Sequence, residues 1–149
     1  MNTCTFCGHG TVLDGIRDTL FSAVRNMIES HGTDCFYVGN QGQFDRLALA
    51  VLSQLKKEYP HIRFYVALAY MSGAKPEFPF ADEPETVFPD GLETVPRRFA
   101  ISHRNRWMVD RSKYLIAYVN HDYGGAAQTL RYAIGKGTIE IINLAHSSS

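Results

Sequence analysis

A chain of 149 residues is long enough to bury one hydrophobic core and too short for two ordinary domains, so we expect a single domain over residues 1–149. Hydrophobic residues make up 45% and charged residues 20%, with 15 basic and 15 acidic side chains, as in ordinary soluble globular proteins. The balanced charge gives no bulk field to recruit nucleic acid, and the sequence contains neither a signal-peptide pattern nor a run of about 18 apolar residues. We therefore expect a cytoplasmic protein without nucleic-acid or membrane partners.

The first part of the chain predicts strands that alternate with helices. Thr3–Cys7 is β-prone, and apolar residues at helical spacing from Asp14 predict a helix that Gly32 ends. Cys35–Val38 predicts a second strand. The clearest amphipathic helix follows, from Phe44 to Tyr59.

The second part resumes this alternation after one interruption. Ile62–Ala69 predicts a third strand, and its nearly continuous apolar character is typical of a parallel sheet covered on both faces. Residues 70–96 contain five prolines and predict a long irregular insertion or lid. A helix is expected from about Arg97 to Asp110. The chain then predicts a strand, a helix and a strand at Tyr114–Val119, Gly125–Lys136 and Thr138–Leu144.

These elements predict an α/β fold, a Rossmann-like three-layer sandwich around a mainly parallel five-stranded sheet. With right-handed crossovers, the simplest strand order is 3-2-1-4-5. The order changes direction between the first and fourth strands, and ligands of such sheets bind at that point. We therefore expect the functional site between the loops that follow these two strands.

Three glycine-bearing loops follow predicted strands, at residues 6–10, 38–42 and 120–125. A strand that enters a glycine loop and then a helix directs backbone N–H groups and the positive end of the helix dipole toward a ligand. Such an arrangement suits a phosphate group. The three loops together predict one crevice for a phosphorylated ligand.

Four segments carry a resemblance to a known family: TFCGHG, YVGNQGQFDRLALAVL, FAISHRNRWMV and YVNHDYGGAAQTLRYA. Together they resemble the SLOG superfamily over nearly the whole chain. This superfamily includes lysine-decarboxylase-like phosphoribohydrolases, DprA-related DNA-processing proteins and nucleotide-sensing domains of bacterial conflict systems. The resemblance implies a Rossmann-like fold and nucleotide-derived ligands, ADP-ribose derivatives and cyclic nucleotides among them, in signalling, anti-phage defence or counter-defence.

The sequence departs from the family pattern at two places. Gly10 stands where an arginine often follows the histidine of the first loop, which removes a phosphate-binding guanidinium there. In the phosphoribohydrolases a carboxylate follows the last glycine loop, whereas here Thr129 is followed by Leu130, Arg131, Tyr132 and Ala133. Without that acid, stabilisation of a ribosyl transition state is harder to explain. This departure favours binding over hydrolysis.

The residues expected to bind the ligand come from the glycine loops and the helices that follow them. Backbone amides of the first loop suit a phosphate, and carboxamides of the second suit ribose hydroxyls or phosphate. An acidic residue in the second helix can accept from a ribose hydroxyl or cap nearby amides. The ligand set is Gly8, His9, Gly10, Gly39, Asn40, Gln41, Gly42, Asp45, Arg104, Gly124, Gly125, Ala126, Gln128 and Thr129. For each the alternative is structural: a tight turn, a helix cap or a solvated face.

Three further residues are candidates only if the protein is an enzyme. His121 and Asp122 are adjacent in a predicted site loop and can do acid–base work, and Glu93 is the best spare acid of the insertion. The alternative for this His–Asp pair is a solvated turn. We expect no metal and no cofactor, because no second cysteine pair completes a zinc site with Cys4 and Cys7.

The insertion and the helix after it divide charge, with acidic residues from Glu77 to Glu93 and basic residues from Arg97 to Lys113. Arg97, Arg104 and Arg111 are seven residues apart, so they line an anion site or pair with the acidic segment or a second subunit. The insertion also carries Phe78, Pro79, Phe80 and Phe88, which suit a lid or a dimer contact. We expect a homo-oligomer.

The sequence thus predicts a protein that binds a nucleotide or nucleotide-derived signalling molecule and senses or sequesters it. An enzyme that hydrolyses the N-glycosidic bond of a nucleotide is one alternative. An oligomeric protein-interaction module is the other.

Overall fold

The computed structural model describes residues 2–10, 12, 15–70 and 84–146. Within them the chain forms six strands and four α-helices. The strands are β1 (Thr3–Gly8), β2 (Cys35–Val38), β3 (Arg63–Ala67), β4 (Glu85–Val87), β5 (Tyr114–Tyr118) and β6 (Glu140–Asn143). The helices are α1 (Ile16–His31), α2 (Gly42–Glu58), α3 (Ala100–Asp110) and α4 (Gly125–Lys136). The α/β class predicted from the sequence is confirmed.

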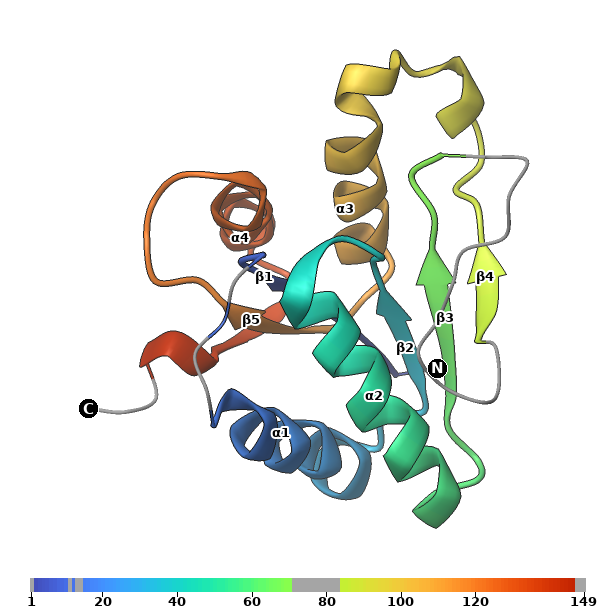
Figure 1. Ribbon diagram of the computed structural model, residues 1–149, viewed down its shortest axis with the longest axis vertical. Helices are drawn as coiled ribbons and strands as arrows, with labels where there is room; N and C mark the ends of the chain where they lie inside the picture. Colours follow the sequence, from blue (N-terminus) through green and yellow to red (C-terminus); the bar gives the residue numbers. More distant parts are fainter. Residues whose placement is uncertain (1, 11, 13–14, 71–83, 147–149) are drawn as a thin grey trace.

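All six strands are parallel, in the order β4-β3-β2-β1-β5-β6 (Figure 1). The five strands expected from the sequence keep the predicted order, and the direction changes between β1 and β5 as expected. Parallel strands joined by right-handed crossovers have their carboxyl ends at one edge of the sheet. In Figure 1 the arrowheads of β2, β3 and β4 point to this edge, at the top of the view.

Alternation along the strands separates two hydrophobic layers. Cys4 and Phe6 of β1 belong to the cluster that includes α1 and α2, whereas Cys7 belongs to the cluster that includes α4. Ile116 and Leu115 of β5 divide in the same way. Successive side chains of a strand point to opposite faces, so α1 and α2 cover one face of the sheet and α4 the other. The three-layer sandwich follows.

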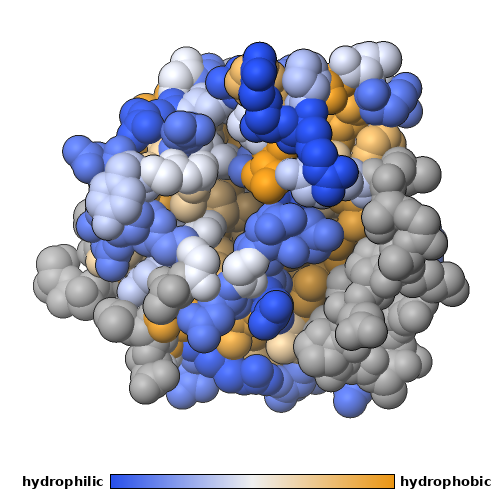
Figure 2. All heavy atoms as spheres, turned by 45° about the horizontal axis from the view of Figure 1, so that its top comes forward, coloured by the Kyte–Doolittle hydropathy of each residue, from blue (hydrophilic) through white to orange (hydrophobic). Residues whose placement is uncertain are grey.

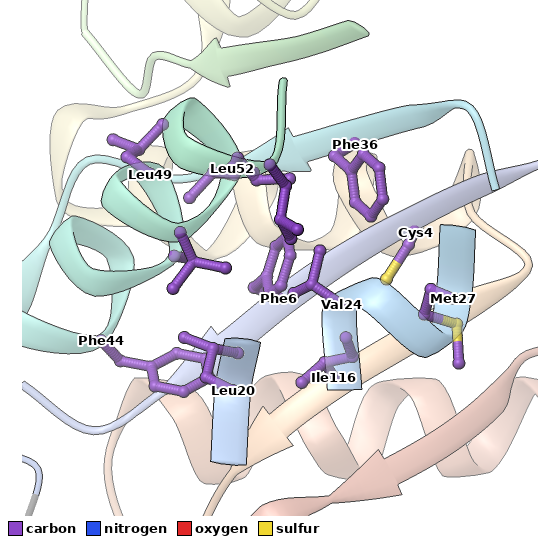
Figure 3. Packing of buried hydrophobic residues seen from close by; sticks show 14 of the residues in the cluster. Cys4, Phe6, Leu20, Val24, Met27, Phe36, Phe44, Leu49, Leu52 and Ile116 are labelled. Atoms are coloured by element: carbon purple, nitrogen blue, oxygen red, sulfur yellow. The ribbon is translucent and has the colours of Figure 1, made fainter. Parts of the chain in front are cut away.

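The larger layer is packed from the side chains shown in Figure 3. Phe6 and Phe36 of neighbouring strands stack with ring centroids 6.2 Å apart. Leu20 of α1 and Phe44 of α2 are fully buried beneath them, as is Leu52. Phe44 lies in the first turn of α2, against Gly8 at the end of β1, so this core reaches the edge where the glycine loops lie (Figure 3).

The prediction that residues 70–96 are irregular throughout is wrong. β4 lies within them and pairs in parallel with β3, with Glu85 opposite Tyr65. A three-residue edge strand that carries an exposed Glu85 has too little periodicity to be found from the sequence. Phe88 packs against a small cluster with Leu92 and Ala100 rather than forming a free lid surface. Residues 71–83, and with them Phe78, Pro79 and Phe80 of the expected lid, lie outside the described residues.

Three shorter findings complete the fold. The helix expected from about Arg97 begins instead at Ala100, because residues 97–99 form a separate 3₁₀ turn. Cys4, Cys7 and Cys35 are free and buried, and burial raises the pKa of the Cys7 thiol to about 12, so it stays protonated. Within the described ranges no helix combines the length and apolar character needed to cross a membrane.

Candidate functional site

A cleft of about 570 Å³ opens at the carboxyl ends of β1 and β5. This is the point where the strand order changes direction. Figure 2 brings this edge of the molecule forward and shows a hollowed surface, with hydrophobic residues in its depth and hydrophilic residues around it. The cleft is lined by Phe6, Cys7, Gly8, His9, Gly10, Gln41, Gly42, Asp45, Ile101, Arg104, Asn105, Met108, Asn120, His121, Tyr123, Gly124, Gly125 and Ala126.

The loop after β1 is fastened to the start of α2. The backbone N–H of Gln43 donates to the carbonyl of Gly10 over 2.9 Å. Gly42 has a φ of +86°, and a Cβ there would lie 2.8 Å from the Gly10 Cα. Glycine is therefore required at residue 42 for this approach of one backbone to another. The contact makes one continuous wall from the first two glycine loops.

The N-terminus of α4 forms the opposite wall. Gly124 precedes the helix with a φ of +92°, and no side chain caps the helix. Gly125 and Ala126, which line the cleft, are the first two helical residues, and their N–H groups have no partner within an α-helix. A Cβ on Gly125 would meet nothing within 4 Å, so the space in front of the helix is open. Within the described part of the chain these two N–H groups have no partner, so the wall presents donors together with the positive end of a helix dipole.

Arg104 of α3 is buried to 1% exposure at the bottom of this cleft. Its Nε donates to Asn105 Oδ1 over 2.8 Å, and its Nη1 donates to Asn40 Oδ1 and to the Ala67 carbonyl over 3.0 Å each. Among the described residues, Nη2 makes no hydrogen bond and Arg104 has no ion-pair partner. The guanidinium is thus fixed by neutral oxygens and keeps donor capacity for a ligand.

Asp45 of α2 is 8% exposed and lines the same cleft. Its Oδ2 accepts the backbone N–H of Gln41 over 2.9 Å, so the carboxylate secures the start of its own helix. Burial raises the pKa of Asp45 to about 6, against the opposing effects of the Gln41 hydrogen bond and the positive charge of Arg104. Within the described part of the chain, Oδ1 accepts no hydrogen bond. The helix-capping and ligand-binding alternatives for Asp45 are therefore compatible.

Gly39 separates these two charged side chains. A Cβ on Gly39 would lie 2.8 Å from Asp45 Oδ2 and 3.2 Å from Arg104 Nη1. Asp45 and Arg104 nevertheless form no ion pair in the described structure. Atoms of both side chains therefore pack closely against Gly39, and we call the part of the cleft that Asp45 and Arg104 both line the gap between them.

Three aromatic rings stack at the rim of the cleft. The rings of His9 and His121 lie 3.5 Å apart between centroids, and the ring of Tyr123 lies 3.8 Å from that of His121. Tyr123 is the outermost ring and is 68% exposed. The stack joins the loop after β1 to the loop after β5 and ends in an exposed aromatic face that lines the cleft.

The tautomer of His9 is fixed by a backbone contact. The N–H of Asn120 donates to His9 Nε2 over 3.0 Å, so the neutral ring carries its proton on Nδ1. Burial lowers the pKa of His9 from its ordinary value of 6.5, and the charge of His121 lowers it further.

NMR titration is expected to show His9 protonated on Nδ1 at neutral pH with a pKa below 6.5. His121→Gln should bring this pKa closer to 6.5. A proton on Nε2 at neutral pH, or a pKa above 6.5, would contradict the geometry.

The structure brings together most of the ligand set expected from the sequence. The members that line the cleft are Gly8, His9, Gly10, Gln41, Gly42, Asp45, Arg104, Gly124, Gly125 and Ala126. Gly39 and Asn40 stand behind the lining, where Asn40 holds Arg104. Gln128 is exposed, and buried Thr129 donates its hydroxyl hydrogen to the Gly125 carbonyl over 2.9 Å, so both lie outside the lining.

The three candidates for acid–base chemistry are separated. His121 lines the cleft, but Asp122 does not, and the Asp122 carbonyl accepts a hydrogen bond from Arg131. Glu93 lies in the 3₁₀ turn Leu92–Thr94 and is also outside the lining. Among the described residues, no cluster of three or more His, Cys, Asp or Glu side chains is placed to hold a metal ion.

Sequence reasoning missed two features of the site. Asn105 orients the Arg104 guanidinium. It was not predicted as a site residue, although it follows Arg104 directly in the family-like segment. Tyr123 was not predicted as a site residue, although its position between His121 and Gly124, beside a glycine turn, pointed to one. Arg97 and Arg111, expected on the same face as Arg104, lie instead over the rings of Tyr70 and Trp107.

No protein-family model matches this chain, and no curated protein matches its sequence. The SLOG resemblance therefore remains an expectation.

Proposed function

We propose that the cleft binds a nucleotide or a nucleotide-derived signalling molecule, and that the protein senses or sequesters this ligand. The observation that carries the proposal is Arg104, a buried guanidinium that lacks an ion-pair partner in the described structure. It shares its cleft with the uncapped N-terminus of α4.

Energetics support an anionic ligand at this place. A buried charge is unfavourable unless it is paired, and three hydrogen bonds to neutral oxygens offset this only in part. An anion between Arg104 and the N–H groups of Gly125 and Ala126 would satisfy both the guanidinium and the helix dipole. A phosphate group has the charge and the several acceptor oxygens that such a site needs.

The rest of the cleft suits the remainder of a nucleotide. Its volume of about 570 Å³ lies within the range of ordinary small-molecule sites. Tyr123 presents an exposed ring immediately before the α4 N-terminus, and a nucleobase can stack on such a face. Phosphate and base would then be held by adjacent residues of one loop.

Asp45 favours hydrolysis of an N-glycosidic bond as the second candidate function. It is a carboxyl group that lines the cleft, and its pKa of about 6 suits proton transfer near neutral pH. This candidate predicts release of free base from a nucleoside monophosphate and loss of that release in Asp45→Asn. Absence of turnover across a broad nucleotide panel would leave binding alone.

The proposal is tested with two arginine substitutions on the same helix. Gly125→Arg should abolish nucleotide binding, because the new side chain enters the open space in front of α4. Gly135→Arg is the matched control, since Gly135 is exposed on α4, outside the cleft lining, and its Cβ would also meet nothing within 4 Å. Both variants should keep the thermal midpoint of the ligand-free protein within a few degrees of wild type.

The measurement is native mass spectrometry of gently purified protein, followed by thermal shift with a panel that includes AMP, ADP, GDP, cyclic mononucleotides and ADP-ribose. A co-purified nucleotide, or a thermal shift lost only in Gly125→Arg, supports the proposal. Equal ligand binding by wild type and Gly125→Arg would remove the α4 N-terminus from the site. No binding by any nucleotide would contradict the proposed function.

A further inference from the structure

We propose that the gap between Asp45 and Arg104 binds a ribose hydroxyl of the ligand, so that the cleft selects ribonucleotides over deoxyribonucleotides. This inference rests on the proposed function, which it deepens by naming the sugar.

The gap has one free acceptor and one free donor. Within the described structure, Asp45 uses Oδ2 for the Gln41 N–H and leaves Oδ1 without a partner. Arg104 uses Nε and Nη1 and leaves Nη2 without one. Both residues line the cleft, and neither is more than 8% exposed. Two buried charged groups therefore keep unsatisfied hydrogen-bonding capacity toward one cavity.

A hydroxyl satisfies this pair with a single atom. Its hydrogen donates to the Asp45 carboxylate while its oxygen accepts from the Arg104 guanidinium. A phosphate in direct contact with Asp45 would be repelled by the ionised carboxylate, so the phosphate belongs on the α4 side of Arg104. An ammonium group would be repelled by the guanidinium, and an apolar group would leave both charges unpaired. The sugar of a nucleotide is the part that carries neutral hydroxyls.

Gly39 sets the positions of the two charged side chains that line the gap. The distances of 2.8 Å to Asp45 Oδ2 and 3.2 Å to Arg104 Nη1 from its would-be Cβ are too short for a methyl group to be accepted without movement. Because Gly39 has no positive φ, its conformation alone does not require glycine. A side chain at residue 39 would therefore displace Asp45 or Arg104.

The test compares ADP, 2′-deoxy-ADP and 3′-deoxy-ADP by isothermal titration calorimetry on the wild-type chain. At least one deoxy analogue is expected to bind tenfold or more weakly than ADP, because it leaves a buried donor and acceptor unpaired. Binding of both analogues within tenfold of ADP would overturn the inference while leaving nucleotide binding intact. If no ribonucleotide of the panel binds, the proposed function fails and this inference falls with it.

Gly39→Ala locates the effect. The added methyl group should displace Asp45 or Arg104 and reduce the preference for ADP over the discriminated deoxy analogue to less than threefold. Gly135→Ala is the control, because Gly135 is exposed on α4 outside the cleft lining and a Cβ there would meet nothing within 4 Å, so this variant should keep the preference. A tenfold preference retained in Gly39→Ala, with circular dichroism showing a folded chain, would place the sugar elsewhere and overturn the inference.

Discussion

Gly8→Ala is expected to lower the free energy of unfolding by about 3 kcal/mol, at the upper end of the effects of overpacking a core. A Cβ on Gly8 would clash with two carbon atoms of the Phe44 ring and lie 2.7 Å from the Phe44 Cβ. Phe44 is fully buried, and Gly8 is held in the parallel ladder opposite Tyr118, so neither side has room to move. Urea denaturation followed by circular dichroism measures the change.

Gly10→Ala is the matched control for this prediction. It lies two residues along the same loop, and its Cβ would meet no atom within 4 Å. We expect its unfolding free energy to stay within about 0.5 kcal/mol of wild type, as for most surface substitutions. Equal stability of the two alanine variants would mean that the end of β1 does not pack on Phe44 as described.

Asp45→Asn is expected to stabilise the ligand-free protein at pH 8, by roughly 2–3 kcal/mol if the full pKa shift is expressed. The folded protein binds a proton at Asp45 more tightly than the unfolded chain, because burial raises the carboxyl pKa from 3.8 to about 6. Ionised Asp45 therefore destabilises the fold. This destabilisation is absent below about pH 4, grows as the pH rises through 4 to 6, and is complete above that window.

The measurement is the difference in unfolding free energy between Asp45→Asn and wild type at pH 4, 5, 6, 7 and 8. Using the difference cancels other titrating groups, such as His9, whose lowered pKa acts with the opposite sign below pH 6.5. The difference should rise from pH 4 to pH 7 and then level off. A constant difference, or a variant less stable than wild type at pH 8, would show that Asp45 is not a desolvated carboxylate.

The buried carboxylate of Asp45 links stability to function. When ionised, it lowers the stability of the fold despite its hydrogen bond from the Gln41 N–H, and such stability–function conflicts are found at binding and catalytic sites. Asp45→Asn should therefore combine a more stable fold with a weaker preference for ribose over deoxyribose. The same variant also tests the second candidate function, since loss of base release would make Asp45 an acid–base group.

The sheet could be predicted because its signals are local. Cys35–Val38 and Tyr114–Tyr118 are apolar runs that precede glycine loops, and the right-handed crossover rule then fixes their neighbours. β4 could not be found in this way, since its three residues pair only because β3 offers a free edge. Its existence depends on tertiary contact rather than on sequence pattern.

The position of the site could also be predicted, but the roles of its side chains could not. Arg97, Arg104 and Arg111 share a heptad spacing, and only the packing of α3 against the sheet decides that Arg104 is buried while Arg97 and Arg111 are exposed. The gap beside Gly39 likewise requires three segments, those bearing Gly39, Asp45 and Arg104, to meet in space. The spacing of these three residues along the chain does not predict that they lie in contact.

The expected homo-oligomer and the interaction-module alternative remain predictions. Phe99 and Ile134 are exposed apolar side chains of the kind that such contacts use, at 45% and 61% exposure. Part of the acidic segment that would face a second subunit, including Glu77, lies outside the described residues.

The central claim is that a nucleotide occupies the cleft with its phosphate at the N-terminus of α4 and beside Arg104. The most direct test is a ¹⁵N NMR titration of the protein with ADP and ADP-ribose. We predict saturable shifts of the Gly125 and Ala126 amides and of Arg104 Nε, with little change at Gly137, which follows the far end of the same helix. Shifts confined to residues outside the cleft, or no saturable shift with either ligand, would contradict this claim.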